Sequence, residues 1–400
     1  MLIGRDIVIF GDDWGRYPST IQHIARVLLR SNRIFWIGSL GLRRPHLRIS
    51  DVRRVWEKGF RMFSTSKEGS HASGPICLHP VVMPLHDNAL FHRLTMASVR
   101  RAIRNAMDSL NAKNPVILSS SPWTEALLGE FEESSAHYFC LDDYTLFDDV
   151  FQSVRNAEQE FIKQADSCFF VSDALRAKHG ENARNAYILP QGVDVAHFAK
   201  SGSDTGVTAV PGNKPVVGFI GLVASWIDLE LIARCAHAYP EAIVVIIGKV
   251  AVNESLLPRA PNIMYLGEIS YDLLPGYMRR FTVGLIPFVV NELTVAANPL
   301  KLLEYMAAGM PVVSTNLPEV AKFEPLVYVA KNSDDFLELV GCALRENGLD
   351  RARQRKEKAA EFSWENITEN ICAIIGDLEK QKGSKVDASG NRKNKSDAVS

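Results

Sequence analysis

The chain lacks the features that mark several large classes of protein. It has no apolar run near the roughly 18 residues of a membrane-spanning helix. Its net charge of −1 gives no basic excess to neutralise phosphates, which argues against nucleic acid as a partner. Six cysteines are scattered without C-x-x-C or histidine-linked spacing. They indicate neither a zinc site nor a disulfide framework, and are typical of reduced thiols in a cytosolic core.

A signal peptide and a dinucleotide fingerprint are also absent. Residues 6–10 already read as a first strand, so no leader is expected and the protein is predicted to be cytoplasmic. No G-x-G-x-x-G follows the first strand of either half of the chain. Residues 11–15 have the wrong spacing, and residues 218–221 hold a single glycine pair. This argues against a dinucleotide-dependent oxidoreductase, a class that two Rossmann-like halves would otherwise allow.

What is present is an alternation of short apolar runs with helical stretches, in a chain of ordinary globular composition. Many of the runs are continuously apolar, as strands covered on both faces must be. Strands that alternate with helices predict parallel α/β sheets. The expected strands cover 6–10, 33–37, 76–82, 116–119, 138–141, 168–171, 186–189, 216–220, 243–247, 263–266, 283–287, 312–314 and 326–329.

A stretch rich in glycine, serine and proline interrupts this alternation and is typical of a linker. It divides the chain into two Rossmann-like, doubly wound domains, which are expected to bind ligands at the carboxyl ends of their strands, facing a cleft. The last residues have almost nothing to bury, which predicts a disordered tail. The expected organisation is an acceptor-binding domain (1–200), a linker (201–215), a nucleotide-binding domain (216–380) and a tail (381–400).

Residues 298–314 form the most informative stretch. Asn298 suits a helix N-cap, and Pro299 suits the first helical position, where its missing N–H would be unpaired anyway. The free N–H groups of the first turn then point outward at the positive end of the helix dipole, which suits an anion. Lys301 adds a full charge in that turn, and Glu304, three residues further on, shares its face.

This helix is expected to end at Gly309, and residues 311–315 read as a short buried strand. A phosphate cradle followed one turn later by a carboxylate suits a nucleotide diphosphate, with the pyrophosphate at the helix start and the ribose hydroxyls on Glu304. The alternative is a surface helix with an ordinary cap, a Lys–Glu pair and a glycine stop. Spacing alone leaves both interpretations open.

With these features in order, the second half of the chain, roughly residues 186–375, resembles the C-terminal domain of a GT-B glycosyltransferase. It is most similar to the large retaining group classed as glycosyltransferase family 4, in particular to bacterial members of polysaccharide biosynthesis. The first half matches in strand–helix rhythm and in two turns. The resemblance rests on Pro190-Gln-Gly-Val-Asp194-x-x-His-Phe198, Val217-Gly-Phe-Ile-Gly221, Ile246-Ile-Gly248 and Asn298 to Ser314.

The resemblance implies a nucleotide-diphosphate sugar bound mainly by the second domain. Glu304 matches the second Glu of the family's E-x7-E motif, whose carboxylate holds the ribose hydroxyls. Ala296 stands where the first Glu, which contacts the transferred sugar, is expected. Glu292, Thr294 or Asn298 are the candidates to replace it.

A second departure lies in the turn after Gly221, where typical members carry Arg and Lys but this chain has Leu222 and Trp226. The diphosphate charge then falls to Lys301 and the helix start, with Lys249 as a further candidate. Trp226 is a candidate to stack on the base or sugar, with simple packing as the alternative. The expected donor-binding residues are Gly221, Trp226, Gly248, Lys249, Glu292, Thr294, Asn298, Pro299, Leu300, Lys301 and Glu304.

The resemblance further implies that helix-dipole amides and basic side chains stabilise the departing diphosphate. No cofactor and no essential metal are expected, and the adjacent pair Asp148 and Asp149 reads as a solvated helix face. The family retains anomeric configuration, and no nucleophilic carboxylate is obvious in the sequence. This predicts front-side transfer, in which the diphosphate itself helps deprotonate the acceptor hydroxyl.

Two acidic pairs follow expected strands, Asp12 with Asp13 and Asp142 with Asp143. They could bind acceptor hydroxyls or act as a base; the alternative is a set of carboxylates that only cap nearby helices. Asp13, Asp143 and Lys301 are therefore the candidates for catalysis.

Residues 40–63 carry seven basic and two acidic side chains interleaved with apolar ones, and residues 98–104 are also basic. Such a segment is typical of docking on an anionic membrane surface, as a lipid-linked saccharide acceptor would require. A solvated helix with snorkelling arginines is the alternative. The expected activity is glycosyl transfer to a saccharide acceptor. A nucleotide-sugar epimerase, which would act without an acceptor, and a non-catalytic nucleotide-sugar-binding protein are the other readings.

Overall fold

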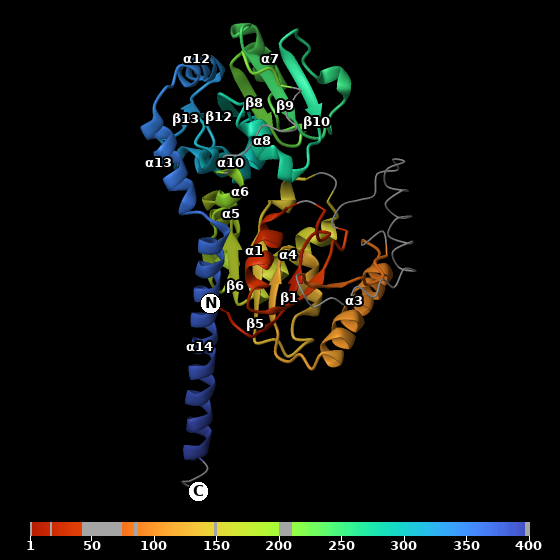
Figure 1. Cartoon of the computed structure of the whole chain (residues 1–400). Helices are drawn as coiled ribbons and strands as arrows, with labels where there is room; N and C mark the ends of the chain where they lie inside the picture. Colours follow the sequence, from red (N-terminus) through yellow and green to blue (C-terminus); the bar gives the residue numbers. More distant parts are fainter. Residues whose placement is uncertain are drawn as a thin grey trace. The chain divides into compact units, whose positions relative to one another are not determined.

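The computed structural model describes residues 2–16, 18–41, 74–83, 87–147, 150–199 and 210–396. The chain divides into two compact units, and each is built on one parallel sheet (Figure 1). Unit 1 comprises residues 1–170, 175–188 and 368–400, whereas unit 2 comprises residues 171–174 and 189–367. The predicted fold class, two Rossmann-like parallel-sheet domains, is confirmed.

The sheet of unit 1 has seven strands in the order β3-β2-β1-β4-β5-β6-β7. The order reverses between β1 and β4, which are direct neighbours in the sheet. Ligands of open α/β sheets bind outside the carboxyl ends of the strands at such a reversal. The strands are β1 (Asp6–Phe10), β2 (Arg33–Ile37), β3 (Ile76–Leu78), β4 (Val116–Ser119), β5 (Ser135–Cys140), β6 (Ser167–Phe170) and β7 (Ala186–Ile188).

The sheet of unit 2 has six strands in the order β10-β9-β8-β11-β12-β13, with the reversal between β8 and β11. Each expected strand overlaps one strand of the structure, because apolar runs between polar turns leave little choice of where along the chain a strand lies. The strands are β8 (Val216–Ile220), β9 (Ile243–Ile247), β10 (Ile263–Gly267), β11 (Val283–Ile286), β12 (Val312–Thr315) and β13 (Tyr328–Ala330).

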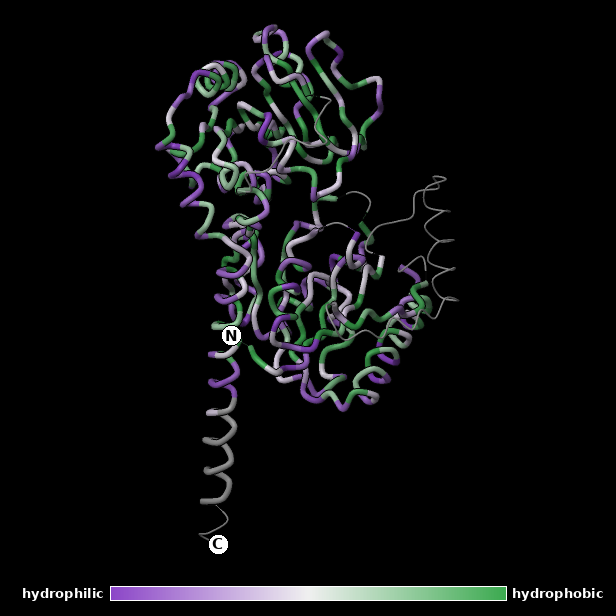
Figure 2. The backbone as a smooth tube through the Cα atoms, in the orientation of Figure 1, coloured by the Kyte–Doolittle hydropathy of each residue, from purple (hydrophilic) through white to green (hydrophobic). Residues whose placement is uncertain are grey.

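Helices cover both faces of the unit 2 sheet because successive strand residues point to opposite faces. Val216 and Ile220 of β8 pack in the cluster that contains α8 and α10, whereas Val217 and Phe219 pack with α7 and α12. Figure 2 shows the strands largely hydrophobic and α13 largely hydrophilic. The helices of unit 2 are α6 (Val195–Phe198), α7 (Leu229–Ala238), α8 (Leu274–Met278), α9 (Glu292–Val295), α10 (Leu300–Ala308), α11 (Pro318–Ala321), α12 (Ser333–Leu344) and α13 (Leu349–Ala360).

The helices of unit 1 pack similarly around its sheet, and two helices carry the chain between the units. The helices of unit 1 are α1 (Thr20–Leu28), α3 (Ala89–Ser109) and α4 (Gln152–Gln164). Helix α5 (Asp173–His179) begins in unit 2 and continues in unit 1, and α14 (Trp364–Ser396) does the same.

The units begin and end at other residues than composition predicted. Residues 189–199 belong to unit 2, because the backbone of Val193 accepts a hydrogen bond from Trp364 and donates one to Phe362. At the other end, residues from Thr368 onward belong to unit 1. Helix α14 also extends to Ser396, through most of the range predicted to be a disordered tail.

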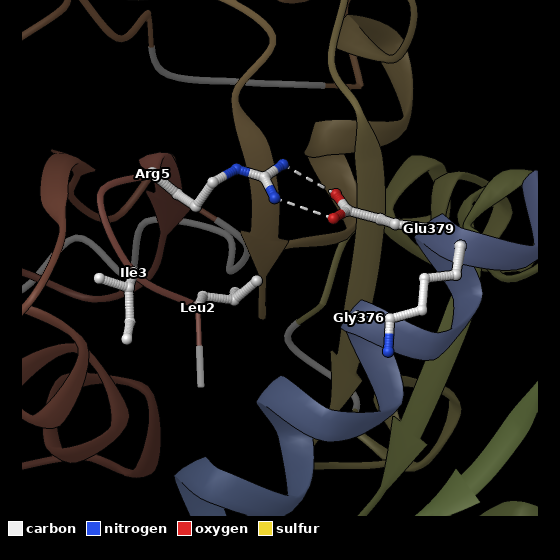
Figure 3. Close-up of a pocket in the computed structure, with 6 residues that line it drawn as sticks. Leu2, Ile3, Arg5, Gly376 and Glu379 are labelled. Atoms are coloured by element: carbon white, nitrogen blue, oxygen red, sulfur yellow. Dashed lines mark hydrogen bonds and ion pairs between the residues drawn. The ribbon is translucent and has the colours of Figure 1, made fainter. Parts of the chain in front are cut away.

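Ion pairs and hydrogen bonds to unit 1 explain why α14 belongs there. Glu379 forms two hydrogen bonds with the Arg5 guanidinium, both 2.9 Å (Figure 3). It accepts further ones from Ser134 and Ser135. Lys382 lies 2.5 Å from Asp166. Composition alone predicted the tail to start at residue 381, and Glu379 and Lys382 lie on either side of that point. These bonds therefore hold the helix to unit 1 across the predicted start of the tail.

A hollow of about 510 Å³ lies between residues 2–5 and α14 (Figure 3). Arg5 directly precedes β1, Ser134 directly precedes β5 and Ser135 begins it, so the hollow lies at the amino-terminal edge of the unit 1 sheet. Ligands of parallel sheets bind at the opposite edge. The functional site is therefore expected at the carboxyl ends of the strands.

Candidate functional site

Two glycines bring together the turns that follow β8 and β9. Gly248 has φ +143°, a conformation that side chains rarely adopt, and a Cβ atom on it would lie 1.8 Å from the carbonyl oxygen of Gly221. The N–H of Gly221 donates to Ile247, and the N–H of Val223 donates to Lys249. The two expected donor-site glycines thus let the two loops pack closely beside the end of the sheet. The Lys249 side chain beside them is exposed.

Helix α10 starts one residue later than predicted. Pro299 is the N-cap, with extended ψ of 112°, and Leu300 is the first helical residue. The Asn298 amide instead donates to the carbonyl oxygen of Val171, 2.9 Å away. Because no side chain caps α10, the N–H groups of Leu300 and Lys301 remain at the positive end of the helix. The predicted helix is present, but without Asn298 as its cap. The helix ends at Gly309, as predicted, with φ +82°.

Lys301 and Glu304 lie together on this helix, as their spacing predicts. The Lys301 Nζ atom lies 2.6 Å from Glu304 Oε2. The Glu304 side chain is 8% exposed and that of Lys301 is 27% exposed. A buried carboxylate held by a lysine at a helix start can accept hydrogen bonds from hydroxyl groups while the lysine faces an anion.

A small pocket of about 60 Å³ lies beside this pair, within unit 2. It is formed by the end of β8, the following turn, the end of β11 and Lys301. Three aromatic side chains line it, those of Phe219, Trp226 and Phe288. Trp226 is half-buried and also packs against the core under α7, so its predicted packing and its position at the pocket coexist.

The loop before α10 has most of its polar side chains engaged. Thr294 is buried and forms a capping box with Asn291 at the start of α9, and its hydroxyl also donates to Val289. Ala296 is 8% exposed, and its carbonyl oxygen accepts a hydrogen bond from Ser172. Glu292, in the first turn of α9, is exposed. The three candidates to replace the missing Glu therefore differ, since Thr294 and Asn298 are engaged and Glu292 is exposed.

The first acidic pair lies at the carboxyl end of β1 in unit 1. Asp12 accepts hydrogen bonds from Ser19, the N-cap of α1, and from Gln22. Burial raises the pKa of Asp12, and these two hydrogen bonds oppose the rise. Asp13 accepts a hydrogen bond from the backbone of Ser39, and its side chain is 33% exposed. Asp12 thus holds the turn, whereas Asp13 is the more accessible carboxylate.

The second pair lies at the end of β5, where Asp143 is buried. Its carboxylate accepts hydrogen bonds from the N–H and hydroxyl of Thr145, and Lys178 Nζ lies 2.7 Å away. Burial opposes ionisation, but His179 at 3.9 Å, Lys178 and Thr145 together hold the pKa of Asp143 well below its usual range. This geometry favours a role in holding the turn over one as a proton acceptor. Lys178 had no signal in the sequence, because it lies 35 residues from Asp143.

Several expectations lie wholly or partly outside the described residues. Asp148 and Asp149 do so, as do residues 42–63 of the basic segment. Where the structure describes the chain, it places no three His, Cys, Asp or Glu side chains together to hold a metal ion. In the same residues, none of the helices combines the length and apolar character needed to cross a membrane.

Known proteins resemble this chain in sequence and in fold. Residues 214–345 match the family model described as glycosyl transferases group 1. The chain is 28% identical over 237 residues to TuaH of Bacillus subtilis (strain 168), a protein provisionally assigned as a teichuronic acid biosynthesis glycosyltransferase. That alignment covers 56% of this chain and 60% of TuaH, so the chain spans less than two thirds of that relative's length.

Solved structures extend the similarity to both units. Sucrose-phosphate synthase from Thermosynechococcus elongatus has a TM-score of 0.67 at 13% identity, covering 94% of this chain and 99% of that one. Anabaena Alr3699/HepE, solved in complex with UDP-glucose, has a TM-score of 0.64 at 14% identity, covering 92% and 99%. The chain therefore has the GT-B fold and carries a glycosyl transferases group 1 domain in unit 2.

Proposed function

We propose that this protein is a glycosyltransferase that moves a sugar from a nucleotide-diphosphate sugar to a saccharide or lipid-linked saccharide acceptor, with retention of configuration. The observation that carries the proposal is the uncapped start of α10, with the Lys301–Glu304 pair beside an aromatic-lined pocket. The group 1 domain match and the GT-B fold support the same conclusion.

In this proposal the bond between the anomeric carbon and the diphosphate oxygen breaks, and negative charge grows on the diphosphate. The N–H groups of Leu300 and Lys301 and the Lys301 ammonium stabilise that charge without a metal. Glu304 accepts hydrogen bonds from the ribose hydroxyls. The acceptor hydroxyl bonds to the anomeric carbon on the face that the diphosphate leaves, and its proton passes to a diphosphate oxygen.

The acceptor is assigned to unit 1, where Asp13, after β1, has a partly exposed carboxylate at the carboxyl edge of the sheet. On α3, the exposed side chains Leu90 and Leu94 flank the exposed Arg93. This pattern supports peripheral contact with an anionic membrane. Cosedimentation with phosphatidylserine vesicles tests the contact, and equal binding to neutral vesicles would contradict it.

The first test is thermal stabilisation by nucleoside diphosphates and their sugars, with and without EDTA. Uridine nucleotides come first, since HepE was solved with UDP-glucose. A ligand at 100 times its dissociation constant adds about 2.7 kcal/mol to the free energy of unfolding. We expect Glu304→Ala to remove this gain. Glu357→Ala, which alters a side chain on α13 that is 68% exposed, is the matched control and should preserve it.

The products separate the three readings. Incubation with donor alone should yield no epimerised sugar, whereas an epimerase needs no acceptor. Transfer to an acceptor should give a product with the donor's anomeric configuration, and an inverted product would refute front-side transfer. Nucleotide binding without any transfer would indicate a non-catalytic binding protein. If no diphosphate stabilises the wild type, the proposal fails.

A further inference from the structure

The loop that leads into α10 is hydrogen-bonded to a distant four-residue segment of the chain. Residues 171–174, which follow β6, belong to unit 2, while the chain on both sides of them belongs to unit 1. The Ser172 hydroxyl donates to the carbonyl oxygen of Ala296 over 2.7 Å. The Asn298 amide donates to the carbonyl oxygen of Val171 over 2.9 Å. The segment and the loop thus hold each other at two adjacent points.

The bond from Ser172 is buried, and the bond from Asn298 is partly buried. Ser172 is fully buried and Val171 is 1% exposed. A hydrogen bond shielded from water keeps its geometry better than an exposed one, and a buried polar group left without its partner is costly. The two bonds therefore constrain the loop between α9 and α10 more strongly than surface contacts would.

The segment is itself fixed to unit 2 at its other end. The N–H of Asp173 donates to Glu319, whose side chain is 4% exposed, and Lys322 lies 2.6 Å from Glu319 and 2.8 Å from Asp173. The opposite end of the loop is fixed by the capping box of Asn291 and Thr294. The capping box thus holds the chain before residue 295, and the two bonds from the segment 171–174 hold it at residues 296 and 298.

We propose that Ser172 and Asn298 are positioning residues for the donor: they hold residues 296–298, and through them the first N–H groups of α10, in the geometry that accepts a diphosphate. Position 296, where the family resemblance expects a carboxylate, instead serves through its backbone oxygen. Asn298, expected to cap α10 or to contact the sugar, leaves the helix start open to the ligand. The inference rests on the proposed function for its ligand, but its structural part does not.

Amide hydrogen exchange of the ligand-free protein tests the structural part. Ser172→Ala removes one bond and Asn298→Asp removes the other without changing the side chain's shape. Each should speed exchange within residues 295–301 by about threefold to tenfold, the range expected for loss of one net hydrogen bond. Asp173→Asn is the matched control. It loosens the half-exposed ion pair of the same segment with Lys322 but leaves both bonds to the loop and the Lys322–Glu319 pair, so exchange should stay within about twofold of wild type.

Diphosphate affinity tests the functional part. Both variants should weaken UDP, or whichever diphosphate the wild type binds, by about threefold to tenfold. The double variant should lose less than the product of the two effects, because both act on one loop. Unchanged affinity in variants whose loop exchanges faster would make the bonds merely structural and overturn the proposal. So would an equal effect of Asp173→Asn. If the wild type binds no diphosphate, the proposed function fails, whereas unchanged exchange refutes the positioning role itself.

Discussion

A buried glutamate in unit 1 should make the stability of the protein depend on pH near neutrality. Glu158 lies on α4 and is 1% exposed. Its Oε1 atom accepts a hydrogen bond of 2.7 Å from the Tyr138 hydroxyl. Burial raises the pKa of Glu158 from 4.5 to about 7, with the bond from Tyr138 opposing the rise. The folded protein therefore keeps a proton on this carboxyl that the unfolded chain releases.

The sign and size of this pH dependence follow from the difference in proton binding between the folded and unfolded states. Between pH 4.5 and 7 the folded state binds more protons than the unfolded state, so the free energy of unfolding falls as pH rises and then levels off. At 1.36 kcal/mol per pKa unit, the difference between 4.5 and about 7 corresponds to roughly 3 kcal/mol. Glu158→Gln cannot ionise but keeps an oxygen for Tyr138. Its buried amide N–H costs about 1 kcal/mol, which leaves a gain of about 2 kcal/mol at pH 8.

At pH 4, below both pKa values, the carboxyl is mainly protonated in the folded and in the unfolded state, so the same variant should be about 1 kcal/mol less stable than wild type. Urea denaturation of both proteins at pH 4 and pH 8 measures this reversal of sign. Glu160→Gln, on the same helix with a side chain 49% exposed, is the control and should stay within about 0.5 kcal/mol at both values. A difference between wild type and Glu158→Gln that is equal at the two pH values would refute the reasoning.

Two further substitutions test how the fold supports the site. Arg355 is fully buried and pairs with Glu346 over 2.7 Å. Arg355→Met should lower the free energy of unfolding by about 3 kcal/mol in urea denaturation, because it leaves a buried carboxylate without this partner. A loss below about 1 kcal/mol would contradict this. Gly248→Ala should abolish diphosphate binding in a titration, because its Cβ would clash with the Gly221 carbonyl. Gly267→Ala, with φ +69° and open space around it, should cost about 1 kcal/mol yet bind normally, and equal binding by both variants would refute the argument.

The sequence predicts the fold well because the information is local. Short, mostly apolar runs place β1, β2, β8 and β9 at their observed bounds, since both faces of these strands are covered. One of the differences is instructive: residues 326–329 are expected to be a strand, but β13 starts at Tyr328. The carbonyl oxygen of Leu326 is used by Arg355, 29 residues later. Apolar character alone could not reveal that contact.

In the site too, contacts between neighbouring residues could be predicted and contacts between distant residues could not. Lys301 and Glu304 are three residues apart, so helical spacing suffices to pair them. Asn298 has the composition of an N-cap, but its partner Val171 lies 127 residues away. The same holds for Ser172 and Ala296, which are 124 residues apart. Contacts between distant segments decide which polar side chains remain available to a ligand, and no local pattern encodes them.

Under the proposed function, that availability favours one residue as the contact to the transferred sugar. Of the three candidates to replace the missing Glu at Ala296, Thr294 is used in a capping box and Asn298 holds Val171. Glu292 is exposed, and it lies four residues before Ala296, so its carboxylate is one turn away on the same side of α9. We expect Glu292→Gln to lower kcat/KM for the preferred donor sugar by about tenfold or more, since hydrogen bonds to a charged group contribute roughly 1.5–3 kcal/mol. Affinity for the free nucleoside diphosphate, which has no sugar, should not change. Steady-state kinetics with calorimetry on the same samples separates the two terms, and an equal loss in both would mean that Glu292 acts on the diphosphate instead.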